Sequence, residues 1–119
     1  MALYTSLPVY KVAYELLIEI FKRTSGFSRE YKYTLGERLK NESLDLISNI
    51  YRANKSEKQH RVRFIADARD NVESIRLMLR ITRDLNVIGN KPFVFLSGKV
   101  ENVSVQLAGW QQYTAGVSK

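Results

Sequence analysis

The sequence predicts an all-α fold: an up-down-up-down antiparallel four-helix bundle that assembles into a homo-oligomer. Two observations lead to the bundle. In four successive segments, apolar residues recur at steps of three and four, the spacing of one helix face. Short loops join these segments, and short loops force neighbouring helices to run antiparallel. A length of 119 residues suits one core, so we expect residues 1–119 to form a single domain.

The first two expected helices lie in the N-terminal half. Ser6 is the expected N-cap of the first, Pro8 fits its first turn, and Gly26 ends it. The second begins either at a capping box formed by Thr34 and Glu37 or earlier, at Ser28. The apolar positions of the two helices are Val9, Val12, Ala13, Leu16, Leu17, Ile20 and Phe21, and then Leu35, Leu39, Leu46, Ile47 and Ile50.

The last two expected helices follow the same spacing. A capping box at residues 56–59 starts the third helix, which runs to about Val87, just before Gly89 and Asn90. Pro92 lies in the first turn of the fourth helix, whose apolar seam resembles that of a coiled coil. The core positions are Ile65, Ala68, Val72, Ile75 and Leu79 in the third helix and Phe93, Leu96, Val100, Val103, Leu107 and Trp110 in the fourth.

The chain is strongly basic. Nineteen Lys and Arg residues against twelve Asp and Glu residues give a net charge of +7 and a pI of about 9.8. Such an excess fits either a polyanionic partner or a solvated basic surface. With no cysteine, a disulfide framework, a thiolate zinc site and a cysteine nucleophile are excluded. No basic leader precedes an apolar run, and no run approaches the roughly 20 residues that span a bilayer, so we expect a cytoplasmic protein without membrane contact.

The third helix concentrates the positive charge. On a helical wheel Arg69, Arg76, Arg80 and Arg83 lie within about 60° of one another, on the flank of the core face, and Lys58 joins them. The pattern fits three interpretations: a solvated face paired with Glu73, a subunit interface, or a phosphate-binding face. We call this set the basic stripe: Lys58, Arg61, Arg69, Arg76, Arg80 and Arg83.

The same helix carries a second apolar set on roughly its opposite side: Leu77, Ile81, Leu85 and Ile88. A helix in a small monomeric bundle needs only one apolar face. The second set therefore indicates either deeper burial within one chain or an interface between copies of the chain. We favour the interface, and hence a homo-oligomer.

No set of residues predicts catalysis or a cofactor. His60 is the single histidine, so a transition-metal site is not expected. The sequence holds neither a phosphate-cradling glycine loop nor a Ser/His/Asp set, and we expect a protein that is not an enzyme. Tyr31 and Tyr33 alternate with Arg29 and Lys32, a pattern that suits stacking on unpaired bases but more often closes a bundle end or fills an interface.

Four features together resemble a known family. They are Leu35-Gly36-Glu37 with Leu39, the run from Leu46 to Asn54, the arginine-rich third helix, and Gln106-Leu107-Ala108-Gly109-Trp110. In their order and length they resemble the four-helix-bundle proteins encoded in intervening sequences of bacterial ribosomal RNA genes. Within that group, the chain is most similar to the accessory variability determinants of diversity-generating retroelements. The ribosomal branch usually has Asn-Ile-Ala-Glu-Gly where this chain has Asn49-Ile50-Tyr51-Arg52-Ala53.

The resemblance implies a homopentamer with a positively charged surface that binds RNA and DNA with little sequence preference. It also implies association with a reverse transcriptase during mutagenic copying, without a catalytic role. The basic stripe would then contact nucleic-acid phosphates. The alternative is a structural or protein-interaction bundle of the ribosomal type, with no direct nucleic-acid role and with the arginines at a subunit interface.

Overall fold

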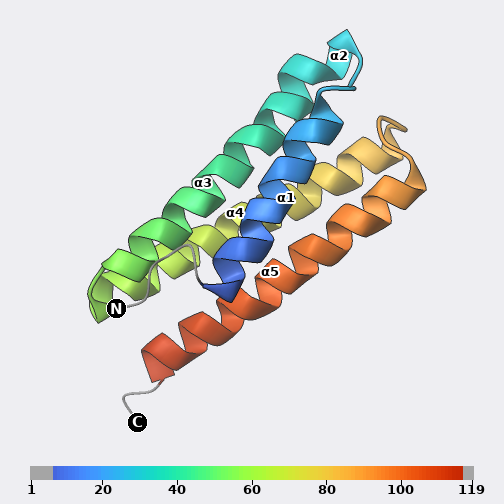
Figure 1. Cartoon of the computed structure of the whole chain (residues 1–119). Coiled ribbons are helices and arrows are strands. Elements are labelled where there is room, and N and C mark those ends of the chain that lie inside the picture. Colours follow the sequence, from blue (N-terminus) through green and yellow to red (C-terminus); the bar gives the residue numbers. More distant parts are fainter. Residues whose placement is uncertain (1–6, 117–119) are drawn as a thin grey trace.

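The computed structural model describes residues 7–116, and within this range every regular element is a helix and there is no strand (Figure 1). The all-α prediction is confirmed. The four long helices are α1 (Pro8–Thr24), α3 (Glu37–Lys55), α4 (Lys58–Asp84) and α5 (Asn90–Gly116). A single α-turn, α2 (Arg29–Tyr31), and a π-helix, η2 (Lys32–Gly36), connect α1 to α3.

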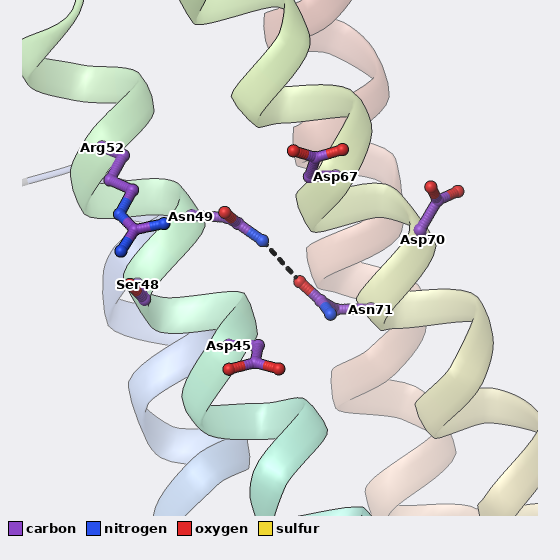
Figure 2. Close-up of a pocket in the computed structure, with 7 residues that line it drawn as sticks. All are labelled: Asp45, Ser48, Asn49, Arg52, Asp67, Asp70 and Asn71. Carbon is purple, nitrogen blue, oxygen red and sulfur yellow. Dashed lines mark hydrogen bonds between the residues drawn. The ribbon is translucent and has the colours of Figure 1, made fainter.

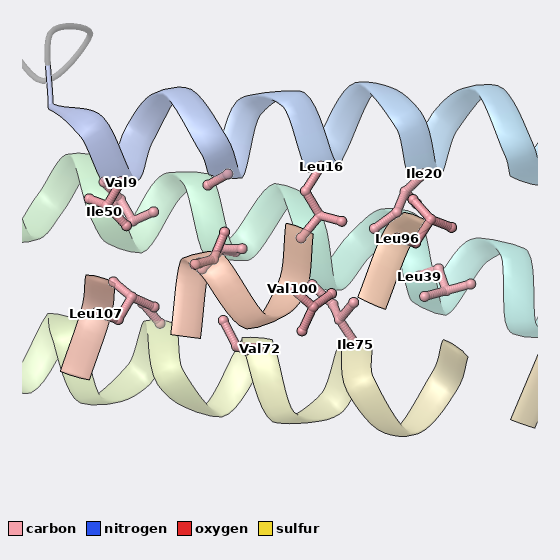
Figure 3. Close-up of a cluster of buried hydrophobic side chains, with 14 of the residues drawn as sticks. Val9, Leu16, Ile20, Leu39, Ile50, Val72, Ile75, Leu96, Val100 and Leu107 are labelled. Atoms are coloured by element: carbon pink, nitrogen blue, oxygen red, sulfur yellow. The ribbon is translucent and has the colours of Figure 1, made fainter. Parts of the chain in front are cut away.

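The long helices enclose one core. Each of them packs against two others: α1 and α4 each contact both α3 and α5. The bundle is narrow, with principal extents of 48 × 20 × 19 Å, so its core is a column along the helix axes (Figure 3). All four helices contribute fully buried aliphatic side chains, among them Leu16, Ile20, Leu39, Leu46, Ile50, Ile65, Ile75, Leu79, Leu96, Val100 and Leu107. These are the positions that the three-and-four spacing predicts.

The caps differ from those expected. Ser6 lies outside the described residues, and the N-cap position of α1 is Leu7, which makes no side-chain capping bond. The helical run towards α3 starts after Ser28, the earlier of the two predicted starts, so Thr34 lies inside it. The Thr34 hydroxyl donates to the carbonyl oxygens of Glu30 and Tyr31, and the expected capping box is therefore absent.

The capping box expected before α4 is also wrong. The Ser56 hydroxyl donates to the Arg52 carbonyl oxygen at 2.6 Å, so it closes the end of α3 instead of opening α4. Glu57 takes the N-cap position with an extended backbone and makes no side-chain capping bond. A serine between two helices can serve either one, and the spacing of residue types does not distinguish them.

Helix α4 ends earlier than Val87. Asn86 adopts a left-handed conformation with φ of 60°. Its N–H donates to the Arg83 carbonyl oxygen at 2.9 Å, and the Val87 N–H donates to that of Thr82 at 2.8 Å. This pair of bonds is a Schellman motif, which satisfies the last carbonyls of a helix and requires a left-handed residue. The turn then leads into α5.

We predict that Asn86→Val lowers the free energy of unfolding by about 1–2 kcal/mol, because a β-branched residue is strained in the left-handed region. Asn86→Gly should leave stability unchanged or raise it, since glycine adopts this conformation freely. The Asn86 side chain is exposed, so neither change removes a buried contact. Urea unfolding measures both, and equal stability of the two variants would contradict the prediction.

Candidate nucleic-acid interface

Three arginines of the basic stripe lie along the seam between α4 and α5. The Arg69 Nη1 donates to the Gln111 Oε1 at 2.6 Å, and the Arg76 Nη1 donates to the Glu101 Oε1 at the same distance. The guanidinium carbon of Arg83 lies 4.4 Å from the centre of the Phe93 ring. Three arginines, spaced along the length of α4, therefore each contact a side chain of α5.

Arg76 is the most strongly engaged arginine of the stripe. Besides Glu101, it contacts both carboxylate oxygens of Glu73, at 3.3 and 3.4 Å. The hydrogen bond that Arg76 donates to Glu101 raises the pKa of Arg76, partial burial opposes the rise, and the contacts with Glu73 add to it. The sequence predicted Glu73 as a partner, but not Glu101. Two carboxylates of the chain balance the positive charge of Arg76, so this residue attracts an outside anion only weakly.

Arg61 is directed at the protein itself. Its Nε donates to the Ala53 carbonyl oxygen at 2.9 Å, and its Nη2 donates to those of Asn54 and Ser56 at 3.3 and 3.0 Å. These carbonyls belong to the end of α3 and the turn that follows, where the regular hydrogen-bond pattern of the helix ends. Arg61 therefore fastens the start of α4 to the end of α3.

The remaining members of the stripe are more accessible. Lys58 and Arg80 are exposed, and within residues 7–116 the structure shows no ion pair for either. Arg69 contacts an uncharged amide, and Arg83 pairs at 3.2 Å with the exposed carboxylate of its neighbour Asp84. Because exposed contacts of this kind contribute little to stability, Arg69 and Arg83 can exchange them for contacts with a phosphate. Lys58 and Arg80 can contact a phosphate without giving up an ion pair within residues 7–116.

The excess charge of the chain gathers at the two ends of the bundle. Residues 51–63, where α3 meets α4, hold five basic residues and one acidic residue, a net charge of +4. Residues 22–40, which contain α2 and η2, hold six basic and two acidic residues, again +4. The remainder of the chain carries −1, so carboxylates balance the middle of the basic stripe.

A polar groove runs between α3 and α4, on the side of α4 away from α5. Asn49 donates to Asn71 at 2.8 Å (Figure 2). Asn71 in turn donates to Glu42 at 2.9 Å, and the two bonds join the helices. In the part of the chain that the structure describes, no group of three His, Cys, Asp or Glu residues could hold a metal ion. The groove is lined by Asp45, Ser48, Asn49, Arg52, Asp67, Asp70 and Asn71, and its carboxylates disfavour a polyanion.

The predicted apolar interface is only partly exposed. Leu77 and Leu85 are exposed, at 56% and 48%, whereas Ile81 and Ile88 are half-buried. Ile88 packs against the bundle core, because the chain turns inward after Asn86. Deeper burial within the chain thus explains Ile88, one of the two alternatives left open for this set.

The sequence reasoning missed an apolar outer face on α5, made by Val94, Phe95 and Val105. A Cβ atom built on Gly98 or Gly109 would meet nothing within 4 Å, so both glycines also face outward. The signal was present: only Lys91, Lys99 and Glu101 are charged among the 27 residues of α5.

Fold and charge together define a small basic four-helix-bundle protein. In residues 7–116, no helix is both long and apolar enough to cross a membrane. The chain belongs to the bAvd-like family, the bacterial accessory variability determinants, whose family model matches residues 9–114. The resemblance inferred from the sequence is therefore confirmed at the level of the family. A search of curated proteins finds no match.

We predict that Arg61→Ala lowers the free energy of unfolding by about 2 kcal/mol, because partly buried carbonyls at the end of α3 lose a charged donor. Arg63→Ala is the matched control. Arg63 is exposed on the same turn and the same charge is removed, so its loss should change stability by less than about 0.5 kcal/mol. Denaturant unfolding of both variants checks the pair, and an equal loss of stability would argue against the role of Arg61.

Proposed function

We propose that this protein is a non-enzymatic accessory factor of a diversity-generating retroelement, which binds RNA or DNA through the phosphate backbone and acts beside a reverse transcriptase. Membership of the bAvd-like family is the observation that carries the proposal. The net charge of +7 supports a polyanionic partner. Helical arginines and lysines around a bundle suit contacts to phosphates rather than to base edges, so the expected binding has little sequence preference.

Within the basic stripe, the proposed phosphate contacts are Lys58, Arg69, Arg80 and Arg83. The other two members of the predicted set, Arg61 and Arg76, act mainly in holding helices together, because carbonyls and carboxylates of this chain already surround them. Exposed basic residues at the junction of α3 and α4 extend the surface, namely Lys55 and Arg63.

The proposed assembly is a homo-oligomer of up-down-up-down bundles, with five subunits as the family resemblance implies. The contacts of α4 with α5 support the antiparallel order, because Arg69 meets Gln111 whereas Arg83 meets Phe93. A closed ring needs two different patches on each subunit, one for each neighbour. The apolar end of α4, with Leu77 and Leu85, and the outer face of α5 provide two such patches.

We predict that Lys58→Ala/Arg80→Ala weakens binding of labelled RNA and DNA oligomers. It should also lower the slope of log Kd against log salt concentration by about 1.5, since each lost phosphate contact contributes about 0.7–0.9. Fluorescence anisotropy across a salt series measures the slope. A wild-type affinity that does not depend on salt would contradict nucleic-acid binding and favour the alternative of a protein-interaction bundle.

The control for that variant is Lys11→Ala/Lys99→Ala. Lys11 is exposed on α1 and Lys99 of α5 pairs with Glu15 of α1, so neither belongs to the basic stripe or to the two basic ends, and the change in net charge is the same. An equal fall of the slope in the control would show a general effect of charge and would reject the stripe as the site. Association with the reverse transcriptase is tested by co-purification with the reverse transcriptase encoded beside this gene.

We predict that Leu77→Asp and Val105→Asp each break the oligomer into smaller species, because a carboxylate in an apolar interface loses its hydration. If the ring joins the α4 patch to the α5 patch, a mixture of the two variants should form a 1:1 dimer through the one intact pair of patches. Leu44→Asp is the control, since Leu44 on α3 is 47% exposed and belongs to neither patch. Light scattering after size exclusion measures the masses, and wild-type assembly by both interface variants would reject these patches.

A further inference from the structure

The aromatic side chain of Tyr33 is strongly exposed. Tyr33 has 67% of its surface open to solvent, although it lies between Tyr31 and Leu35, which both pack against the core. Residues 31 and 35 are one helical turn apart on the inner side, and a residue midway between them points outward. A buried tyrosine ring would stabilise the fold by removing apolar surface from water. Because Tyr33 stays exposed, packing within this chain does not explain why an aromatic residue occupies this position.

The backbone beneath Tyr33 is firmly held. It belongs to the π-helix η2, a rare form that is frequent at functional sites. Gly36 closes this turn and is buried, and a Cβ there would lie 3.5 Å from the Phe27 ring and 3.6 Å from Thr24. The Thr34 hydroxyl bonds to the preceding turn. Tyr33 is therefore an exposed ring on a fixed base rather than on a loose loop.

Basic residues outnumber acidic ones in the segment that contains Tyr33. Arg29 is exposed one turn before Tyr33, and Lys32 is its half-buried neighbour in the chain. Of the two nearby carboxylates, that of Glu37 pairs with Lys40 at 3.1 Å, which leaves Glu30 as the exposed acid of the segment. The end of the bundle formed by residues 22–40 carries a net charge of +4. A ring in this setting attracts a ligand that is flat and anionic.

We propose that Tyr33 is a stacking platform for an unpaired nucleobase, with Arg29 and Lys32 contacting the phosphates on either side. This inference rests on the proposed nucleic-acid binding and specifies its partner as single-stranded RNA or DNA. In a duplex both faces of an internal base are already stacked, so a protein ring competes only for bases that are unpaired. Stacking depends on the face of the base, which agrees with low sequence preference.

The test compares single-stranded and duplex oligomers of equal length, as RNA and as DNA, by anisotropy. Tyr33→Ala should lower single-strand affinity about tenfold, the effect of losing one stacked base, and leave duplex affinity unchanged. Tyr33→Phe should keep the affinity, since the ring and not the hydroxyl stacks. Tyr113→Ala is the control, because Tyr113 is 68% exposed and lies near the end of α5, away from α2 (Figure 1).

A second readout is photo-cross-linking. Single strands that carry 5-iodouridine should cross-link to the peptide that contains Tyr33, and Tyr33→Ala should abolish that cross-link. Unchanged single-strand affinity in Tyr33→Ala, with salt-dependent binding intact, would overturn the stacking platform and leave the proposed function standing. A smaller oligomer in Tyr33→Ala would overturn it as well, by making the ring a subunit contact. Wild-type protein that binds neither polymer would overturn both.

Discussion

The structure depends on one constraint: four apolar stripes must be buried in a single narrow column. With extents of only about 20 Å across, the bundle has room for one layer of side chains from each helix (Figure 3). Fully buried residues such as Leu46, Ile75 and Val103 fix the rotation of their helices about the long axis. Once each rotation is fixed, the direction of every charged side chain on that helix follows.

For α4, this constraint directs Arg69, Arg76 and Arg83 to the seam with α5. There each of the three meets a different partner: an amide, a pair of carboxylates, or an aromatic ring. A guanidinium can stack and form several hydrogen bonds at once, which explains why arginine rather than lysine predominates in this seam. Arginine thus holds helices together at positions 61 and 76, whereas in the proposed function it contacts an outside anion at positions 69, 80 and 83.

The surface divides into regions of distinct chemistry. The two ends are basic, the groove between α3 and α4 holds three aspartates, and the outer face of α5 is nearly without charge. This division separates the proposed tasks, because a phosphate backbone, a second copy of the chain and an unpaired base each need a different surface. The acidic groove also limits where a polyanion can lie, since it repels phosphates from one side of α4.

The sequence by itself determined the helices, their core faces and the family, because the apolar residues that face the core recur at steps of three and four along the chain. It also indicated the arginines and an extra apolar surface. The partners of those arginines were decided by tertiary structure, since Gln111 and Glu101 are 42 and 25 residues away in the chain. The same holds for Arg61, whose acceptors are backbone carbonyls that every residue possesses. Likewise, only the π-helix and the packing of Gly36 decided that Tyr31 lies inward and Tyr33 outward, because neighbouring residue types alone do not record which side of a turn the core occupies.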